Sequence, residues 1–415
     1  MHHDRRGIAI TSTSAAATRH LDDAVTSFLA HRVDTNDHLA AALAADDRLA
    51  AAHCLSGFLH LLLGRSELLP PARHALEMAG ASLARRGGTA RERALFAALD
   101  SWCSGEMELS AAILDASLAA NPLDAMTAKL VHGLRFMLGD AAGMRRSLEA
   151  ILPAWSQPVP GFGFLLGCHA FALEETDALA AAEEVGRRAL ALEPQDVWGC
   201  HAVAHVHEMR GEPARGIAWV RAHAGRWNAV NNFARHMSWH EALCYLARND
   251  IDAVFALYDG QIRKIRSDDY RDVTNAAGLL RWLERKGHAV GARWDELAAI
   301  AERRTRDHAL VFAQLHYLIC LIGAGHWDAA YRCFAAMDLE ARGGEGSQAR
   351  LLAEVGVPLA KIMLADAEGS APAPQTILRL RGAIARLGGS RAQRRTFEQI
   401  LDDAETRHQA QRAVA

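Results

Sequence analysis

The sequence predicts an all-α protein built as a solenoid of helix pairs, and three observations support this. Half of the 415 residues are hydrophobic and only 6% are aromatic, and long stretches are rich in the strong helix formers Ala, Leu, Arg and Glu. Strand signals, meaning Val-, Ile- and Thr-rich segments closed by Asn-Gly or Asp-Gly, are almost missing. A pattern of helix, turn and helix returns after about 34 residues, which is typical of repeat proteins.

The best-defined repeat covers residues 165–198. A first helix is expected over 165–174 and a second over 178–192, and Pro194 then ends the second helix. Similar units occupy residues 101–125, 201–224, 240–262 and 315–337. The period matches that of tetratricopeptide repeats, whose helix pairs bury their apolar faces only by stacking on their neighbours. We therefore expect an α-solenoid of tetratricopeptide-like pairs that form one right-handed superhelix.

No segment of the chain has the composition of an interdomain linker. We expect a single superhelical domain over residues 1–415, with residues 1–10 disordered and with C-terminal capping helices over residues 375–411. The Gly-rich segment 341–348 and the Pro-rich segment 370–374 are expected to be loops within the array.

Composition and charge argue against several classes of function. The formal net charge is −3, so no nucleic-acid partner is expected. No apolar run reaches the roughly 18 residues of a membrane span, and the N-terminus lacks a signal peptide, so we expect a cytoplasmic protein without a membrane partner. The seven cysteines form no CxxC pair, which indicates reduced, buried thiols. P-loop, α/β-hydrolase and Rossmann motifs are also missing.

Histidine occurs 21 times, and its spacing is informative. Residues one repeat apart occupy equivalent places on adjacent units of a solenoid. Because stacked first helices line the concave side, histidines at repeat spacing are expected to form a row that faces the groove. Five histidines in or near predicted first helices follow at intervals of 37, 32, 35 and 72 residues: His132, His169, His201, His236 and His308.

Two members of this row are doubled. Each pair is four residues apart and so shares one helical face: His201 with His205, and His236 with His240. Glu208 extends the face of the first pair. Four imidazoles and a carboxylate suit zinc, iron or copper, so a divalent transition metal held by the two pairs is a candidate cofactor. The alternatives are a metal-free polar pocket, and core histidines whose ring nitrogens bond to carbonyls or to one another.

Two further segments carry candidate residues. Asp272 and Asn275 stand early in a predicted helix, where they either cap its N-terminus or face the groove. Asp307 precedes His308 at another predicted helix start. It acts there either as an N-cap or as a carboxylate that orients the imidazole for acid–base chemistry.

Several sequence blocks are too irregular for a generic repeat. DVWGCHAVAHVHEMRGEPARGI, HMSWHEALCYLARNDIDAVFALYDGQI and RDVTNAAGLLRWLERKGHAVGARW follow one another as in the tetratricopeptide repeat protein 38 family, and the chain resembles a bacterial member from about residue 10 to about residue 405. The resemblance implies the helical-repeat fold. Asn275 departs from the family, whose members tend to have Asp there. The matching candidate positions are His132, His201, His205, His207, Glu208, His236, Trp239, His240, Asp272, Asp307, His308 and His316.

Three functions are compatible with these features. The first is a protein that binds, and also converts, a small molecule in a pocket inside the superhelix, since imidazoles suit proton transfer. The second is a scaffold for a peptide or protein partner, and the third is a metalloenzyme; a homodimer is compatible with all three. We expect the catalytic residues to be His201, His205, Glu208, His236, His240, Asp272 and His308. We expect the pocket to be lined by His132, His169, Trp239, Asn275, Asp307 and His316.

Overall fold

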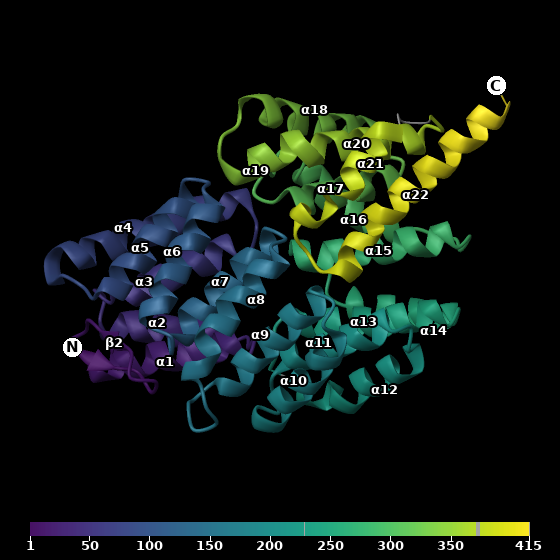
Figure 1. The fold of residues 1–415 in the computed structure, drawn as a ribbon. Helices are drawn as coiled ribbons and strands as arrows, with labels where there is room; N and C mark the ends of the chain where they lie inside the picture. Colours follow the sequence, from purple (N-terminus) through teal and green to yellow (C-terminus); the bar gives the residue numbers. More distant parts are fainter. Residues whose placement is uncertain (228, 371–373, 415) are drawn as a thin grey trace. The chain divides into compact units, whose positions relative to one another are not determined.

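The structure is a computed structural model that describes residues 1–227, 229–370 and 374–414. Nearly all of its regular structure is helical (Figure 1). The prediction of an all-α fold of stacked helix pairs is confirmed. Within the described residues the only paired strands are β1 (His2–His3) and β2 (Ala9–Ile10), which form a short antiparallel ribbon.

Contacts divide the chain into two compact units. Unit 1 comprises Met1–Leu63, Glu67–Phe136 and Ala141–Asp250, and unit 2 comprises Gly64–Ser66, Met137–Asp140 and Ile251–Ala415. The main boundary lies at the turn that follows Asn249. This turn is as short as the turns inside helix pairs, so composition does not mark it.

Unit 1 holds the helices that build the candidate site. Neighbouring helices pack against each other, and alternate helices also touch: α9 contacts α11, and α11 contacts α13. This is the stacking expected of successive helix pairs. The helices are α1 (Ala15–Leu29), α2 (Thr35–Ala45), α3 (Ala50–Leu61), α4 (Leu69–Arg86), α5 (Ala90–Cys103), α6 (Met107–Ala120), α7 (Ala125–Met137), α8 (Ala141–Ile151), α9 (Phe162–Glu175), α10 (Leu179–Leu192), α11 (Val197–Met209), α12 (Pro213–His223) and α13 (Phe233–Ala247).

Small residues let α9, α10 and α11 approach closely. A Cβ atom at Gly167 would lie 2.0 Å from Oδ2 of Asp196, and one at Gly186 would lie 3.2 Å from the carbonyl oxygen of Gly199. Oδ2 of Asp196 also accepts a hydrogen bond from the backbone N–H of Gly199 at 3.1 Å and so caps α11. The cap and the close packing together fix where α11 presents its side chains.

The expectation that residues 1–10 are disordered is wrong. These residues form the β1–β2 ribbon, and the guanidinium of Arg6 donates to Oδ1 of Asp22 at 2.6 Å. Both side chains are only 2% exposed. A buried, charge-assisted pair with α1 therefore holds the segment in place, and local sequence patterns do not reveal it because the two partners are far apart in sequence.

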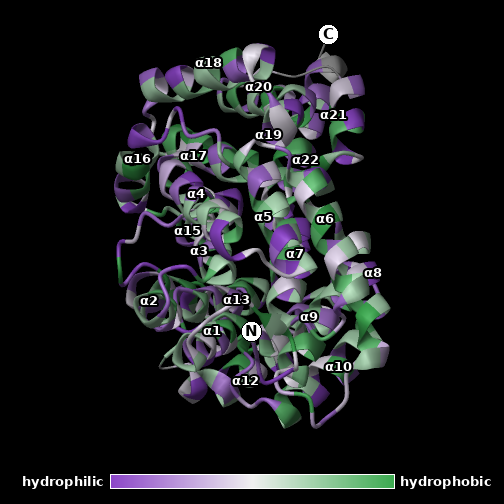
Figure 2. Cartoon of the chain, turned by 90° about the vertical axis from the view of Figure 1, so that its left-hand side faces the viewer, coloured by the Kyte–Doolittle hydropathy of each residue, from purple (hydrophilic) through white to green (hydrophobic). Residues whose placement is uncertain are grey.

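Unit 2 follows the same helical plan. Figure 2 shows that single helices carry hydrophobic and hydrophilic residues on different faces, as amphipathic packing requires. The segment 375–411 falls mainly in the last two helices, of which α22 packs on α15 and α20. The helices are α14 (Ile251–Leu257), α15 (Tyr270–Arg285), α16 (Arg293–Arg303), α17 (Val311–Gly323), α18 (Trp327–Gly343), α19 (Gly346–Leu351), α20 (Val357–Ala367), α21 (Pro374–Arg381) and α22 (Arg391–Val414).

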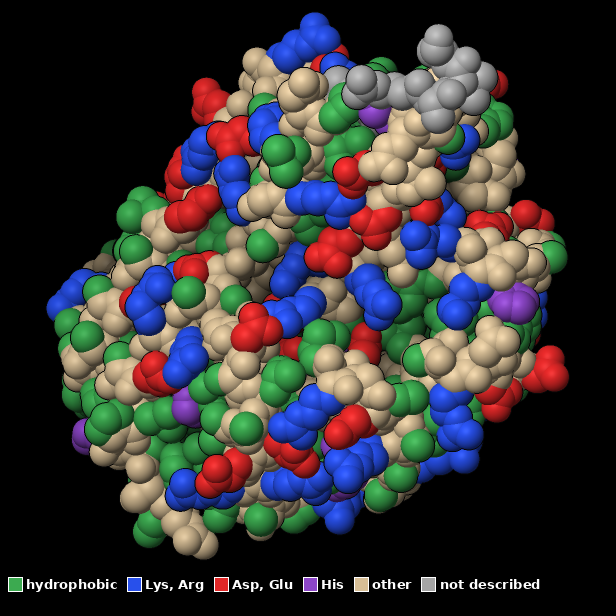
Figure 3. Space-filling view, turned by 45° about the vertical axis from the view of Figure 1, so that its right-hand side comes forward, with side chains coloured by type: hydrophobic (Ala, Val, Ile, Leu, Met, Phe, Trp, Pro, Cys, Tyr) green, Lys and Arg blue, Asp and Glu red, His purple; other side chains and the backbone are tan. Residues whose placement is uncertain are grey.

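The mixed surface charge and the buried cysteines agree with what the composition predicts. On the face shown in Figure 3, acidic and basic side chains are interspersed and few histidines are visible. All seven cysteines are free and buried, as predicted. Within the described chain, no helix is both long enough and apolar enough to cross a bilayer.

Candidate metal centre

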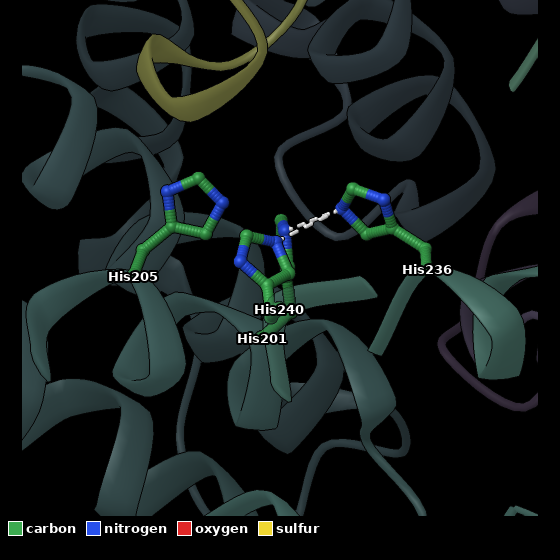
Figure 4. A group of neighbouring side chains, drawn as sticks. All are labelled: His201, His205, His236 and His240. Carbon is green, nitrogen blue, oxygen red and sulfur yellow. Dashed lines mark hydrogen bonds between the residues drawn. The ribbon is translucent and has the colours of Figure 1, made fainter. Parts of the chain in front are cut away.

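Four histidines converge in the interior of unit 1. They are the two doubled pairs of the sequence, which come from α11 and α13, and their side chains face one another in Figure 4. The most exposed of them is 9% accessible. Each offers one ring nitrogen that lies within 4.8 Å of the nitrogens of the others. We call this group the histidine cluster: His201, His205, His236 and His240.

Two of the distances within the histidine cluster are close to those between neighbouring metal ligands. Nε2 of His236 lies 3.0 Å from Nε2 of His201 and 3.1 Å from Nε2 of His240. The ring of His205 turns its Nε2 toward the other three (Figure 4), with its centroid 4.5 Å from that of His240. Tetrahedral zinc with Zn–N bonds of about 2.0–2.1 Å places adjacent ligand nitrogens about 3.3 Å apart. The observed spacing is close to this value.

Glu208 restricts where protons can sit in the histidine cluster. Its Oε2 lies 3.2 Å from Nδ1 of His240, so Nδ1 carries the proton and Nε2 of neutral His240 is a bare acceptor. Nε2 of His236 faces both His240 and His201. If Nε2 of His236 carries a proton, the Nε2 lone pairs of His201 and His240 both point at this nitrogen. If Nε2 of His236 carries no proton, its lone pair faces the lone pair on Nε2 of His240. In either tautomer at least two nitrogen lone pairs point at the same place.

Burial and charge set the protonation of the histidine cluster. Burial lowers the pKa values of His201 and His240 far below the usual range, and positive charge on His205 lowers both further. Burial also acts to lower the pKa of His205, but the attraction of Glu174 and nearby carboxylates outweighs it and raises this pKa. His201 and His240 are therefore neutral at pH 7, which is the form that binds a metal ion.

Two carboxylates at the end of α9 were missed by the sequence reasoning. Oε2 of Glu174 lies 3.4 Å from Nδ1 of His205, and neither side chain is exposed. Glu174, Glu175 and His205 form a second group whose possible ligand atoms lie within 4.8 Å of one another. Glu174 stands 34 residues before Glu208, which is one repeat. The spacing rule that selected the histidines would have found it.

Aromatic rings enclose the histidine cluster. Trp239, which was expected to line a pocket, is 1% exposed and stacks on His236 with ring centroids 5.3 Å apart. Trp198 and Phe233 pack against His201 at 5.1 and 5.0 Å. The enclosure excludes water and strengthens every electrostatic interaction inside.

The other predicted histidines of unit 1 lie outside the histidine cluster. His132 is buried, packs edge-on against Phe171 and Trp198, and has its pKa lowered strongly by burial. His169 places Nε2 3.5 Å from a carboxylate oxygen of Glu149 on α8. The predicted row of histidines thus contains members with different partners, and only the doubled positions meet.

The predicted residues of α15 are buried in unit 2. Asp269, not Asp272 or Asn275, is the N-cap of α15, and its side chain accepts from the backbone N–H of Arg271. Asp272 and Asn275 are buried within the helix, where Oδ1 of Asn275 accepts from Nε2 of Gln393 at 2.9 Å. Of the two roles considered for them, capping is wrong, because an earlier Asp takes that position.

Asp307 and His308 each form a hydrogen bond with a different residue. Leu310 is the N-cap of α17, so capping by Asp307 is wrong. Oδ1 of Asp307 accepts from the hydroxyl of Ser66 at 2.7 Å, and Nδ1 of His308 lies 3.1 Å from Oε1 of Gln314. The carboxylate of Asp307 therefore binds Ser66, which is distant in sequence, and the imidazole of His308 is oriented by Gln314.

His316 is a core histidine of unit 2. It is 1% exposed, and its Nδ1 donates to the carbonyl oxygen of Phe312 at 2.8 Å. Burial lowers its pKa to about 4. This hydrogen bond within the helix accounts for Nδ1 of the ring.

Two cavities of unit 1 lie away from the histidine cluster. Their volumes are about 440 and 600 Å³, and both are lined by Arg32 and Gln195. None of their lining residues belongs to the histidine cluster.

Comparisons with known proteins do not identify the family or the function of this chain. The profiles of known protein families do not match the chain. Among solved structures it is similar to the tetratricopeptide repeat domain of P58(IPK), at 14% identity over 79% of this chain and 90% of that chain, with a TM-score of 0.22. So low a score carries no argument, and the description of the fold rests on the helix stacking itself.

Proposed function

We propose that the protein is a metal-binding helical-repeat protein that holds one divalent transition metal ion in the histidine cluster. The observation that carries this proposal is the convergence of Nε2 atoms at 3.0 and 3.1 Å, combined with carboxylates on the outer nitrogens. Glu208 faces Nδ1 of His240, and Glu174 faces Nδ1 of His205. Metal-bound histidines characteristically donate their second N–H to a carboxylate, which orients the ring.

The charge distribution supports a cation at this place. Glu174 and Glu175 are the last two residues of α9, and Glu208 lies in the last turn of α11. The C-terminal end of a helix carries a partial negative charge and favours cations. Buried carboxylates at two such ends create a negative potential that a divalent ion relieves.

The ligand chemistry selects the class of metal. Imidazole nitrogens suit zinc, copper, nickel and iron, whereas calcium and magnesium prefer oxygen ligands. Four protein ligands close a tetrahedral shell, as in structural zinc sites. The ion would thus link α11 to α13, and its principal effect would be on the stability of the helix stack.

Elemental analysis after metal supplementation tests the proposal. We expect at least one equivalent of a transition metal per chain in protein that carries no affinity tag. The double variant His201→Ala/His240→Ala should lose it. The matched control is His74→Ala, because His74 lies on the surface of unit 1 with its side chain 73% exposed, and it should keep the metal. Wild-type protein with less than a tenth of an equivalent after supplementation contradicts the proposal.

A partner-binding scaffold is the second candidate function. The stacking of α9, α11 and α13 favours it, since arrays of this kind present extended surfaces to partners. The metal centre would then stabilise the scaffold. Membership of the tetratricopeptide repeat protein 38 family is part of this proposal, and the residues of the histidine cluster are among those that carry the resemblance. Binding and conversion of a small molecule stay predictions of the sequence.

A further inference from the structure

His205 belongs to two groups of possible metal ligands at once. Its Nε2 side faces the rest of the histidine cluster (Figure 4), and its Nδ1 lies 3.4 Å from Oε2 of Glu174. Glu175 completes the second group, in which the ligand atoms lie within 4.8 Å of one another. We call this second group the acidic site: Glu174, Glu175 and His205. All three residues are buried, with His205 and Glu174 at 0% exposure and Glu175 at 7%.

Ordinary hydrogen bonding does not account for His205. Neither ring nitrogen makes a hydrogen bond within the described residues, although the side chain is fully buried. A hydrogen bond between an imidazolium and a carboxylate is normally about 2.7–2.9 Å long, and the 3.4 Å contact with Glu174 is longer. A buried imidazole whose two ring nitrogens each face other possible ligand atoms is suited to bridging two cations.

The acidic site also has a local reason to attract a cation. Glu174 and Glu175 end α9, so two buried carboxylates stand at the negative end of the helix dipole. Adjacent carboxylates in a buried site disfavour each other's charged form. One carboxylate is enough to orient His205, and this role does not require Glu175. The two carboxylates and a ring nitrogen of His205 together offer three ligand atoms that lie within 4.8 Å of one another.

We infer that the acidic site binds a second divalent cation, bridged to the ion of the histidine cluster by the imidazole ring of His205. This inference rests on the proposed function of the histidine cluster. In the bridge both ring nitrogens of His205 are unprotonated, with Nε2 bound to one ion and Nδ1 to the other, and the two cations displace the ring protons, which leave to the buffer. The acidic site supplies three protein ligands, two oxygens and one nitrogen, and leaves a coordination position for water or for an oxygen of a substrate.

Copper titration tests the bridge directly. Metal-free protein is loaded with Cu²⁺, and the bound ions are counted by elemental analysis. We expect two ions per chain in the wild type, and an electron paramagnetic resonance spin count well below two because the bridging ring couples the ions. Glu175→Gln should bind one ion with a full spin count. His74→Ala, the surface control, should bind two.

Each outcome separates this inference from the proposed function. No bound copper overturns the proposed function itself. One ion in both wild type and Glu175→Gln overturns the acidic site but leaves the histidine cluster standing. Two uncoupled ions, or two ions in Glu175→Gln, overturn the bridge. If Glu175→Gln does not fold, Glu174→Gln and the spin count of the wild type decide the matter.

Discussion

Buried histidines occur in both units, and they differ in where their ring nitrogens point. His316 of unit 2 bonds to the carbonyl of Phe312 one turn earlier in its own helix. In unit 1, His201 of α11 faces His236 of α13, and the outer nitrogen of His240 faces a carboxylate. Burial lowers the pKa values of His316, His201 and His240 alike. The comparison teaches that neither burial nor a lowered pKa marks a site. A candidate site is marked by ring nitrogens that point toward one another.

The largest difference between the two units should appear on metal removal. Saturating Zn²⁺ at about 1,000 times its Kd stabilises a folded protein by about 4 kcal/mol. We expect this gain in the free energy of unfolding for wild type and its loss in His240→Ala, measured by thermal denaturation with zinc or with a chelator. His316→Gln should lower stability with and without zinc but keep the difference between the two conditions. If zinc raised the free energy of unfolding equally in wild type and in His240→Ala, the predicted difference between the two units would be wrong.

Part of the pH dependence of stability should come from His316. Its pKa falls from 6.5 when unfolded to about 4 when folded, so the unfolded state binds the proton more tightly. The stabilisation is complete above pH 6.5 and is lost as the pH falls toward 4, by roughly 3 kcal/mol at 1.36 kcal/mol per pKa unit. Urea denaturation at pH 7 and pH 4 measures it. In His316→Gln the loss between these pH values should be smaller by this amount, and an unchanged loss would contradict the assignment.

Removal of one orienting carboxylate should have a smaller effect. Glu208→Gln keeps the shape of the side chain but removes the charge beside Nδ1 of His240, and loss of such a partner typically weakens metal binding by about 10–100-fold. The matched control is Glu212→Gln, because Glu212 contacts Nδ1 of His207 at 2.9 Å away from the histidine cluster. Competition with a chromophoric chelator gives both affinities. Equal affinities in the two variants would show that Glu208 has no orienting role.

The smallest effect is expected from the packing that places α11. Gly167→Ala puts a Cβ atom 2.0 Å from Oδ2 of Asp196, and overpacking of this kind costs about 1–2 kcal/mol. Gly225→Ala is the control, since no atom lies within 4 Å of its added Cβ, and it should change the free energy of unfolding by less than about 0.5 kcal/mol. Denaturant titration compares the two. Similar stabilities would mean that α9 and α11 shift apart freely.

Local patterns predicted the helices and the histidine cluster well. Residues 165–174 and 178–192 became α9 and α10 because apolar periodicity and Pro194 act within a few residues. His201 and His236 were found for a related reason, since repeat spacing turns sequence distance into spatial proximity. Repeat spacing and the four-residue interval within each pair were enough to predict a site at the doubled histidines.

Long-range partners could not be predicted in this way. Asp307 bonds to Ser66 across 241 residues, and Arg6 pairs with Asp22 inside unit 1. Nothing near these residues in the sequence records those contacts, so Asp307 was read as a cap or an orienting group. Glu174 was missed for a different reason: the repeat rule was applied to histidines and not to carboxylates.

The ligands of the proposed metal centre lie on α11 and α13 and one orienting carboxylate lies on α9, and this has a consequence for how these three successive first helices would unfold. In a repeat array each unit contacts only its neighbours, so unfolding can begin at any weak pair and spread by fraying. An ion held between α11 and α13, with its orienting carboxylate on α9, would remove that freedom. These helices must then open together or not at all. Amide hydrogen exchange in this block would follow a single cooperative event, while helices elsewhere exchange by local opening.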